Sequence, residues 1–528
     1  MNKLLSNDHL NSNTIQLQLP LSLGTKIDIN DPVVTFREIL EGVNLKKYLF
    51  ADSNEKRGRD GYDPEVMLKI VLFANMLQIR STRKIESLCR NDIRFMWLSN
   101  ESYPTHMTIC NFINKYLLKN IEDISNEIVK YIVKKDGLDI STIFIDGTKI
   151  EAFPNKYSWV WKKACITSRN RKFRQLSELL TQINEADVLP LSTYFETHDE
   201  YGIEEVESYS EKLREVISME NIMFVQGTGK RKHILQKFYE RVNAILIKLK
   251  EYSVKIERCG EHRNSYSKTD EDATFMRMKT DYMGNTALLP AYNWQLVTSD
   301  EYILFGLTSQ MASDNSCFIP IIEKYKSIFG KYPKTPVADA GYGNLETYQY
   351  CEENDMELFM KFPTWKKETH DKKFHNDIYR SVNFKKDDEG NLICPNGKKF
   401  IKLDEKAIPN NKDRRTVERY QCENCEGCPL RAKCHKSKDN RVININKALT
   451  AYHKKVIENL ASDRGVELRM KRSVQSEGAF GIIKQDYNFR RITRVSLNKV
   501  NLEFYLVIIG FNLAKYHNRK YRLNYLPN

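Results

Sequence analysis

Three acidic residues that lie far apart in the sequence share a setting that suits metal-ion chemistry. Asp146 interrupts the stretch 141–152, STIFIDGTKIEA, whose alternating apolar residues predict a buried strand. Asp339 lies in a second apolar stretch, TPVADAGYG, and Glu477 lies in a stretch with helical periodicity. An ionised carboxylate is costly in a buried strand unless it is paired or holds a metal. For Asp146 taken alone, a cap on the turn that follows it explains the acid equally well.

Three carboxylates that converge in the fold can hold two Mg²⁺ or Mn²⁺ ions roughly 4 Å apart. One ion would activate an attacking hydroxyl, and the other would stabilise the leaving oxygen of a phosphodiester. Lys484 follows Glu477 by seven residues, so at about 100° per residue both lie on one helix face. An acid and a lysine placed in this way can engage the same phosphate. Glu and Lys are also the commonest solvated residues on helices, so this pair alone does not indicate a phosphate-binding site.

Five of the eleven cysteines lie together in a segment that is poor in apolar residues. Two overlapping C-x2-C pairs predict structural zinc, because that spacing directs two thiolates to one tetrahedral ion. Free thiols or a redox pair are the alternatives, and five thiols leave the set of four ligands open. A metal would also stabilise a segment with so little apolar surface. The zinc-binding candidates are Cys394, Cys422, Cys425, Cys428 and Cys434.

Composition points to a polyanionic partner. Lys and Arg exceed Asp and Glu by 14 and the pI is near 9.0, which favours nucleic acid. An apolar fraction of 41% is enough for real cores, and 528 residues exceed one ordinary core. No apolar stretch has the length of a signal peptide or a membrane span, so we expect a soluble cytoplasmic protein that does not contact membranes.

The N-terminal part, residues 1–138, is predicted to be a helical domain. The stretch DPEVMLKIVLFANMLQ opens with Asp63 as N-cap and Pro64 at the first helical position. Ser81 is predicted to cap a second helix, and Thr105 or Thr108 a later one. Short helices with basic starts suit a DNA-binding helix-turn-helix module, and a generic dimerisation domain explains them equally well.

The elements that must position the three acids form a mixed α/β (α+β) fold. Residues 139–385 are expected to contain the strand with Asp146, a β-hairpin (ALLPAYNWQLVTS and EYILFGLTSQ), a helix, the strand with Asp339, a helix and a last strand, MELFMKF. This order indicates a mixed sheet flanked by helices, interrupted by a helical insertion at about 155–275. Residues 386–440 form the cysteine-rich insertion. Residues 441–528 complete the core with the Glu477 helix and a basic tail.

Basic and aromatic residues near these elements are candidates for DNA contacts. Trp159 and Trp161 stand among lysines that include Lys162 and Lys163, where rings could stack on unpaired bases while the lysines hold phosphates. The core of a small subdomain is the commoner role for such rings. The basic stretch after the Glu477 helix adds Arg490 and Arg491 as phosphate-binding candidates.

Read in order, several motifs together resemble bacterial insertion-sequence transposases of the DDE class, which have an RNase H-like core. Within this class the motifs resemble the branch designated insertion sequence eleven-eighty-two, which is related to the insertion-sequence-four group. The resemblance extends from about residue 60 to 515. The motifs are IFIDGTKIEA with NKYSWVWKK, ATFMRMK leading into LLPAYNWQLVTSD, VADAGYGNLETY, CENCEGCPLRAKC and QSEGAFGIIKQDYNFRR.

The resemblance implies that Asp146, Asp339 and Glu477 are the catalytic triad that binds two Mg²⁺ or Mn²⁺ ions. It also implies that the chain cleaves double-stranded DNA at transposon ends and joins the exposed 3′-hydroxyls to target DNA. A homodimer is expected because transposition must hold two ends together. The expected location is the nucleoid in the bacterial cytoplasm.

The broader group has a Tyr and an Arg before its glutamate and a Lys seven residues after it. Lys484 matches the last position, whereas Met470 stands at the tyrosine position and Ser473 at the arginine position. On a regular helix Arg472 would lie about 140° from the glutamate and Arg469 about 80°. Both arginines are therefore retained only as phosphate-binding candidates, with Arg469 expected nearer the active face.

Two other functions are compatible with the same motifs. A sequence-specific DNA-binding regulator, or an inactive transposase descendant, would use the helical and cysteine-rich parts without cutting DNA. An RNase H-like nuclease would cut DNA without joining it to a target.

Overall fold

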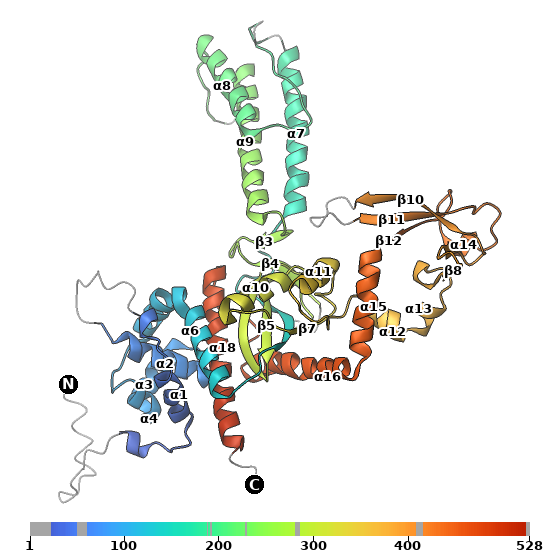
Figure 1. The fold of residues 1–528 in the computed structure, drawn as a ribbon. Coiled ribbons are helices and arrows are strands. Elements are labelled where there is room, and N and C mark those ends of the chain that lie inside the picture. Colours follow the sequence, from blue (N-terminus) through green and yellow to red (C-terminus); the bar gives the residue numbers. More distant parts are fainter. Residues whose placement is uncertain are drawn as a thin grey trace, which may run out of the picture.

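The structure, a computed structural model, describes residues 23–49, 61–186, 188–190, 193–227, 230–279, 286–407 and 416–523. A five-stranded mixed sheet lies at the centre, with helices on both sides of it (Figure 1). A helical arm and a small strand module extend from this body in different directions. No helix within the described ranges has the length and apolar character that crossing a membrane requires.

The strand that carries Asp146, β1 (Thr142–Glu151), is an inner strand of the central sheet. It runs antiparallel to β5 (Leu288–Ser299) on one edge and parallel to β7 (Thr335–Ala338) on the other. The opposite edge of β5 pairs with β6 (Tyr302–Ser309) and, near its start, with β4 (Thr274–Arg277). The sheet order is therefore β6-β5-β1-β7, with β4 beside the beginning of β5.

The predicted β-hairpin is confirmed by the pairing of β5 with β6. Its turn places Asp300 and Glu301 at positive φ angles of 47° and 67°, the conformation that matches the twist of hairpin strands. Nearly every residue of β5 is buried. Burial extends to both faces of this strand, and it includes the polar side chains of Asn293 and Gln295, which alternate with large apolar residues.

The N-terminal part consists of short helices whose predicted caps are confirmed. The side chains of Asp63, Ser81 and Thr105 each accept a hydrogen bond from a backbone amide in the first turn of the helix that follows. Short 3₁₀ segments and one π-helical segment (Ile113–Leu117) lie between them. The helices are α1 (Pro32–Glu41), α2 (Pro64–Met76), α3 (Thr82–Asn91), α4 (Ile93–Leu98), α5 (His106–Phe112) and α6 (Leu118–Lys135).

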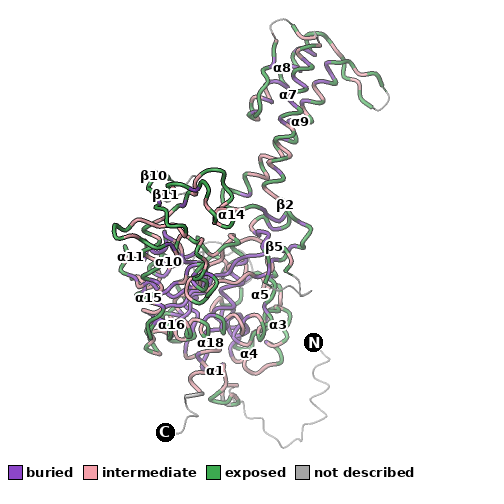
Figure 2. The backbone as a smooth tube through the Cα atoms, turned by 90° about the vertical axis from the view of Figure 1, so that its right-hand side faces the viewer, coloured by how far each residue is buried: buried purple, intermediate pink, exposed green. Residues whose placement is uncertain are grey.

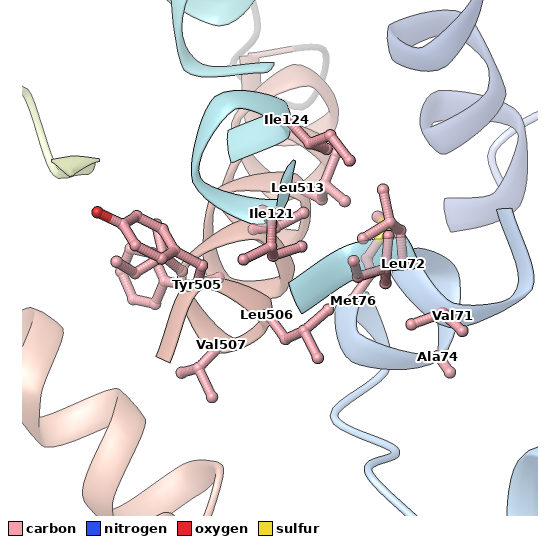
Figure 3. Close-up of a cluster of buried hydrophobic side chains, with 14 of the residues drawn as sticks. Val71, Leu72, Ala74, Met76, Ile121, Ile124, Tyr505, Leu506, Val507 and Leu513 are labelled. Atoms are coloured by element: carbon pink, nitrogen blue, oxygen red, sulfur yellow. The ribbon is translucent and has the colours of Figure 1, made fainter. Parts of the chain in front are cut away.

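The C-terminal helix α18 (Leu497–Leu523) joins these N-terminal helices to the sheet. Apolar residues of α2, α6 and α18 form one buried cluster (Figure 3). On the sheet side, the ring of Phe504 lies against Trp294 of β5, with centroids 4.0 Å apart. Gly510 lets α18 cross α2 closely, because a Cβ at this position would lie 2.4 Å from the carbonyl oxygen of Asn75.

A long helical arm separates β1 from the rest of the sheet in the sequence. It consists of α7 (Lys162–Glu185), α8 (Ile203–Met219) and α9 (Ile234–Cys259), and it projects away from the body (Figures 1 and 2). Its base is a two-stranded pairing of β2 (Trp159–Trp161) with β3 (Ser265–Ser267). The three helices bury a leucine-rich core of their own, so the arm needs little support from the body.

The segment MELFMKF, in the second half of the core, does not form the strand that was predicted. The segment MELFMKF was predicted to be a strand, but residues 356–362 form none. Its apolar side chains are buried against helices, while its backbone bonds instead with Lys334 and the side chain of Asn459. The apolar pattern therefore predicted the burial of this segment correctly, but the prediction of a strand was wrong. The helices here are α10 (Phe318–Phe329), α11 (Leu345–Glu353), α12 (Trp365–His370), α13 (Lys372–Asn376), α15 (Lys447–Ala461) and α16 (Asp463–Arg472).

The cysteine-rich part is a separate strand module. The strands β10 (Phe400–Ala407), β11 (Thr416–Cys422) and β12 (Val442–Ile445) form an antiparallel sheet, preceded by the small pair β8 (Lys385–Lys386) and β9 (Leu392–Ile393). A single turn of helix, α14 (Arg431–Cys434), follows β11 and the cysteine-containing loop after it. Its buried cluster is small and is centred on two phenylalanines and the cysteines.

The close crossing of α2 and α18 predicts that Gly510→Ala destabilises the fold by about 1–3 kcal/mol, because the new methyl group must displace backbone atoms. Urea unfolding followed by circular dichroism would measure this loss. Gly481→Ala is the matched control: a Cβ there meets no atom within 4 Å, so the helix should gain up to about 1 kcal/mol. Equal stability of the two variants would contradict the proposed crossing.

Candidate active site

Asp146 and Asp339 lie beside each other on neighbouring parallel strands. Ile145 of β1 pairs with Ala338 of β7, so the acids that follow them lie side by side, in the middle of β1 and directly after β7. Adjacent strands are separated by about 4.8 Å, which brings the two carboxylates into one electrostatic environment. The two positions, 193 residues apart in the chain, are thus brought together by a strand register.

The carboxylate of Asp146 is largely buried, with 15% of its side chain exposed. Burial raises the pKa of this group to about 6, and the neighbouring charge of Asp339 adds to the rise. The guanidinium of Arg472 and the backbone amide of Gly147 act in the opposite direction. Asp146 is therefore held in a site that disfavours its charge unless a cation is nearby.

Arg472 connects Asp146 to Glu477. Its Nη1 atom lies 3.3 Å from Asp146 Oδ2, and its Nη2 atom lies 3.6 Å from Glu477 Oε1. Glu477 is more open, with 61% of its side chain exposed, and also accepts a hydrogen bond from Ser473 at 2.9 Å. The guanidinium thus lies between two of the three predicted catalytic acids.

The position of Arg472 corrects the expectation drawn from a regular helix. The segment Ser473–Glu477 is π-helical, with hydrogen bonds from residue i to i+5. Residues five apart then lie nearly above one another, so Arg472 and Glu477 share a face instead of lying about 140° apart. Arg469 was expected nearer the active face, but its guanidinium lies 5.3 Å from the ring centroid of Trp365. The expected order of the two arginines was therefore wrong.

Lys484 reaches the same region from a second π-helical turn, Ile482–Asp486, which follows α17 (Gly478–Gly481). Its amino group donates a hydrogen bond to Thr148 Oγ1, two residues after Asp146. Burial and the nearby charge of Lys279 lower the pKa of Lys484 to about 8. The glutamate helix is thereby attached to β1 at both ends of the site, through Arg472 and through Lys484.

Two further lysines were missed in the sequence. Lys279 follows β4 and acts electrostatically on both Asp146 and Lys484. Lys361 lies near Asp339 and Arg472, and burial together with the two nearby arginines lowers its pKa. Lys279 ends the motif ATFMRMK and Lys361 lies in the segment MELFMKF, but neither was singled out, because only the packing of distant segments brings each lysine to the acids.

Asp314, in the loop after β6, is a further acid that the sequence did not reveal. Its Oδ1 atom accepts hydrogen bonds from Asn293 Nδ2 at 2.6 Å and Gln295 Nε2 at 2.8 Å. Gly147 permits this approach, because a Cβ there would lie 2.4 Å from Gln295 Nε2 and 2.7 Å from Asp314 Oδ1. A Cβ at Gly341 would lie within 3.5 Å of both Asp314 and Asp339. Asp314 therefore borders the predicted triad.

The aromatic DNA-contact candidates at the base of the arm are only partly available. Trp159 is 44% exposed, and both Trp159 and Trp161 pack against Phe275 of β4. Lys162 donates a hydrogen bond to the carbonyl of Gly260 at 2.6 Å, which fixes the arm to its base. Lys163 is exposed at the start of α7. Trp161 and Lys162 thus have structural contacts within the protein, a ring contact and a hydrogen bond respectively.

The two arginines after the glutamate helix differ in their contacts. Arg490 is exposed and reaches the carbonyl of Lys484 at 3.5 Å. Arg491 donates to the carbonyl oxygens of Ala152 and Phe153 and lies 3.5 Å from Glu151. Arg491 therefore fastens the end of β1 to the chain beyond the glutamate helix.

The five clustered cysteines line one small cavity of the strand module. Burial and the neighbouring thiols of Cys425 and Cys394 raise the pKa of Cys422 to about 12. His435, which the spacing argument missed, lines the same cavity, and neither of its buried ring nitrogens has a hydrogen-bond partner among the described residues. Soft thiolates and an imidazole are ligands that suit zinc. Cys428 and Cys434 complete the cysteine lining.

Neither the three acids at the central sheet nor the thiols of the strand module have the geometry of a metal site. Across the residues that the structure describes, no three His, Cys, Asp or Glu side chains are arranged so that they could hold a metal ion. At the acids, Arg472 supplies positive charge between two of them. Oxygen donors of this kind are nevertheless the ligands that Mg²⁺ prefers.

Comparison with known proteins connects both ends of the chain to transposases. Residues 393–517 match a family model described as a transposase DDE domain, and residues 21–115 match one described as a transposase domain (DUF772). The first match contains Glu477, Lys484 and the cysteine cluster, whereas Asp146 and Asp339 lie between the two matches. No curated protein and no solved structure matches the chain. The two family matches support a transposase function.

The burial of Asp146 predicts that Asp146→Asn stabilises the metal-free protein. The folded-state pKa of about 6 exceeds the usual value of 3.8, so the folded protein binds this proton more tightly than the unfolded chain. Wild-type stability should fall as pH rises through that window, and above it the charge costs about 3 kcal/mol.

Urea unfolding in EDTA should therefore show a gain of a few kcal/mol for Asp146→Asn at pH 7.5, shrinking to less than about 1 kcal/mol at pH 4. Glu467→Gln is the control, because that acid is exposed on α16 and paired with Lys471. A gain that does not depend on pH would show that burial of the charge is not the cause.

Proposed function

We propose that this protein is a DDE transposase that cleaves double-stranded DNA at transposon ends and joins the 3′-hydroxyls to target DNA. The observation that carries the proposal is the convergence of Asp146, Asp339 and the Glu477 helix, joined through Arg472, in a chain with two transposase family matches. The terminal repeats and the target would bind as duplex DNA, in the bacterial nucleoid. A homodimer would hold the two ends.

The strand order supports assignment of the core as RNase H-like. An inner strand that is antiparallel to a hairpin on one side and parallel to a later strand on the other carries the first acid. The parallel neighbour carries the second acid, and a helix beyond the sheet carries the third. The arm and the cysteine-rich module are insertions into this order.

Asp146, Asp339 and Glu477 would hold two Mg²⁺ or Mn²⁺ ions, which would supply charge stabilisation at the attacking and leaving oxygens. Arg472 neutralises Asp146 and Glu477 when no ion is bound, and it is placed to turn to a phosphate oxygen when the acids engage metal. Lys484, Lys279 and Lys361 surround the acids with positive charge. These side chains would hold the DNA backbone at the carboxylates.

Mutation of the triad tests the proposal. Asp146→Asn, Asp339→Asn and Glu477→Gln are each expected to reduce Mg²⁺-dependent cleavage of a cognate end by at least about 10³-fold, equivalent to the several kcal/mol that metal ions contribute. DNA affinity in EDTA should change little. Glu467→Gln, on the same helical region but paired with Lys471, should cleave normally.

Undiminished cleavage in all three triad variants would refute the catalytic assignment. Binding of DNA without metal-dependent nicking by the wild-type protein would instead support a regulator or an inactive descendant. Nicking without strand joining would indicate a nuclease.

We also propose that the cysteine-rich module binds one structural zinc ion. The support is chemical: five thiols and His435 face one cavity inside a module with few other apolar contacts. Zinc would then contribute directly to the folding of the module.

Metal analysis after dialysis is expected to find about one zinc per chain. The double change Cys425→Ser and Cys428→Ser should remove most of that zinc and lower the melting temperature of the module, whereas Cys110→Ser, outside the cluster, should retain it. Substantially less than one zinc in the wild-type protein would refute the zinc proposal.

A further inference from the structure

The first half of α7, next to the body of the protein, is strongly basic. Between Lys162 and Ser177 the sequence KKACITSRNRKFRQLS contains no acid, and the first one is Glu178. A solvated helix ordinarily mixes both signs of charge along its surface. The basic residues are Lys162, Lys163, Arg169, Arg171, Lys172 and Arg174.

Three of these basic side chains lie on one exposed face. At about 100° per residue, Lys163, Arg171 and Arg174 fall within about 80° of one another around the helix. Thr167 lies between them and Asn170 about 20° to one side, and all five residues are exposed. Four of these side chains carry N–H donors, and the hydroxyl of Thr167 donates to the carbonyl of Lys163. The stretch from Lys163 to Arg174 rises about 16 Å, which corresponds to about five base pairs of duplex.

The cations of this face are not neutralised, unlike those of the neighbouring helix. In the described ranges, no ion pair involves Lys163, Arg171 or Arg174, whereas three of the four lysines of α9 pair with acids of α8 and α9. Lys248 lies 2.8 Å from Glu251. Lys255 pairs with the same Glu251, and Lys250 pairs with Glu207. One arm thus contains both an unpaired and a paired set of basic residues.

The unpaired face begins close to the candidate active site. α7 follows β2 directly, and the tryptophans of β2 pack on Phe275 of β4. Lys279, just beyond β4, acts electrostatically on Asp146 and Lys484. Lys279 therefore places a positive charge between the candidate active site and the base of the arm. Beyond Glu178 the same helix gains acids and the basic face ends.

We infer that the face of α7 formed by Lys163, Thr167, Asn170, Arg171 and Arg174 binds the sugar–phosphate backbone of duplex DNA beside the active site. The inference rests on the proposed transposase function. Side chains of this kind along a helix face position a duplex through its phosphates without reading its bases. The contact is accordingly independent of sequence and sensitive to salt.

A pair of triple variants tests this inference. The first carries Lys163→Ala, Arg171→Ala and Arg174→Ala; the control carries Lys248→Ala, Lys250→Ala and Lys255→Ala. Both remove three positive charges from the same arm, and alanine favours both helices. Binding of a 40-base-pair duplex is measured in EDTA between 50 and 200 mM salt, and circular dichroism verifies that both variants are folded.

The first variant is expected to reduce the slope of log affinity against log salt by about 2–3, because each lost phosphate contact contributes about 0.9. The control should change the slope by less than about 1, since its lysines are already paired. Equal slopes for both variants and the wild-type protein would overturn the inference about α7. Failure of the wild-type protein to bind any duplex would instead refute the proposed function.

Discussion

The charge of Asp146 is the constraint around which the candidate active site is built. β1 buries this carboxylate and places it beside Asp339, so both burial and a like charge oppose its ionisation. Arg472 offsets that cost by lying 3.3 Å away, and it reaches Glu477 with its other nitrogen. The same guanidinium therefore relieves an electrostatic strain and positions the helix of the third acid.

The two π-helical turns in the glutamate helix are part of this arrangement. Each turn adds a residue to the regular repeat, and π-helical bulges are frequent at functional sites. The first brings Arg472 over Glu477, and the second lies where Lys484 bends towards Thr148. A regular α-helix of the same sequence would direct Arg472 away from the acids. The irregular geometry thus sets the charge balance of the site.

The packing of α18 between the N-terminal helices and the sheet explains how such a site stays assembled in a chain with two large insertions. α18 packs on the N-terminal helices and on the hairpin of β5 and β6 at once, where Gly510 admits the backbone of α2 and Gly306 of β6 admits the ring of Phe504. The arm has its own core and the cysteine-rich module has its own sheet, so neither competes for this packing. The body therefore holds the acids, and each insertion folds around a core or sheet of its own.

The sequence by itself determined the local elements, because caps, turns and apolar periodicity act between near neighbours. The strand around Asp146, the hairpin of β5 and β6, the caps at Asp63, Ser81 and Thr105, and the mixed α/β character all followed from such patterns. The proposed triad came from motif resemblance, and its role remains a prediction.

Tertiary structure alone decided which distant residues join these acids. Asp314, Lys279 and Lys361 were not singled out in the sequence, although Lys279 ends the motif ATFMRMK, and they approach the site only through strand register and loop packing. The position of Arg472 depended on a π-helical turn that no residue pattern predicted. The MELFMKF segment is buried but does not pair with a strand. The physical reason is common to these cases: backbone hydrogen-bond registers between segments far apart in the chain are set by global packing, which local sequence does not encode.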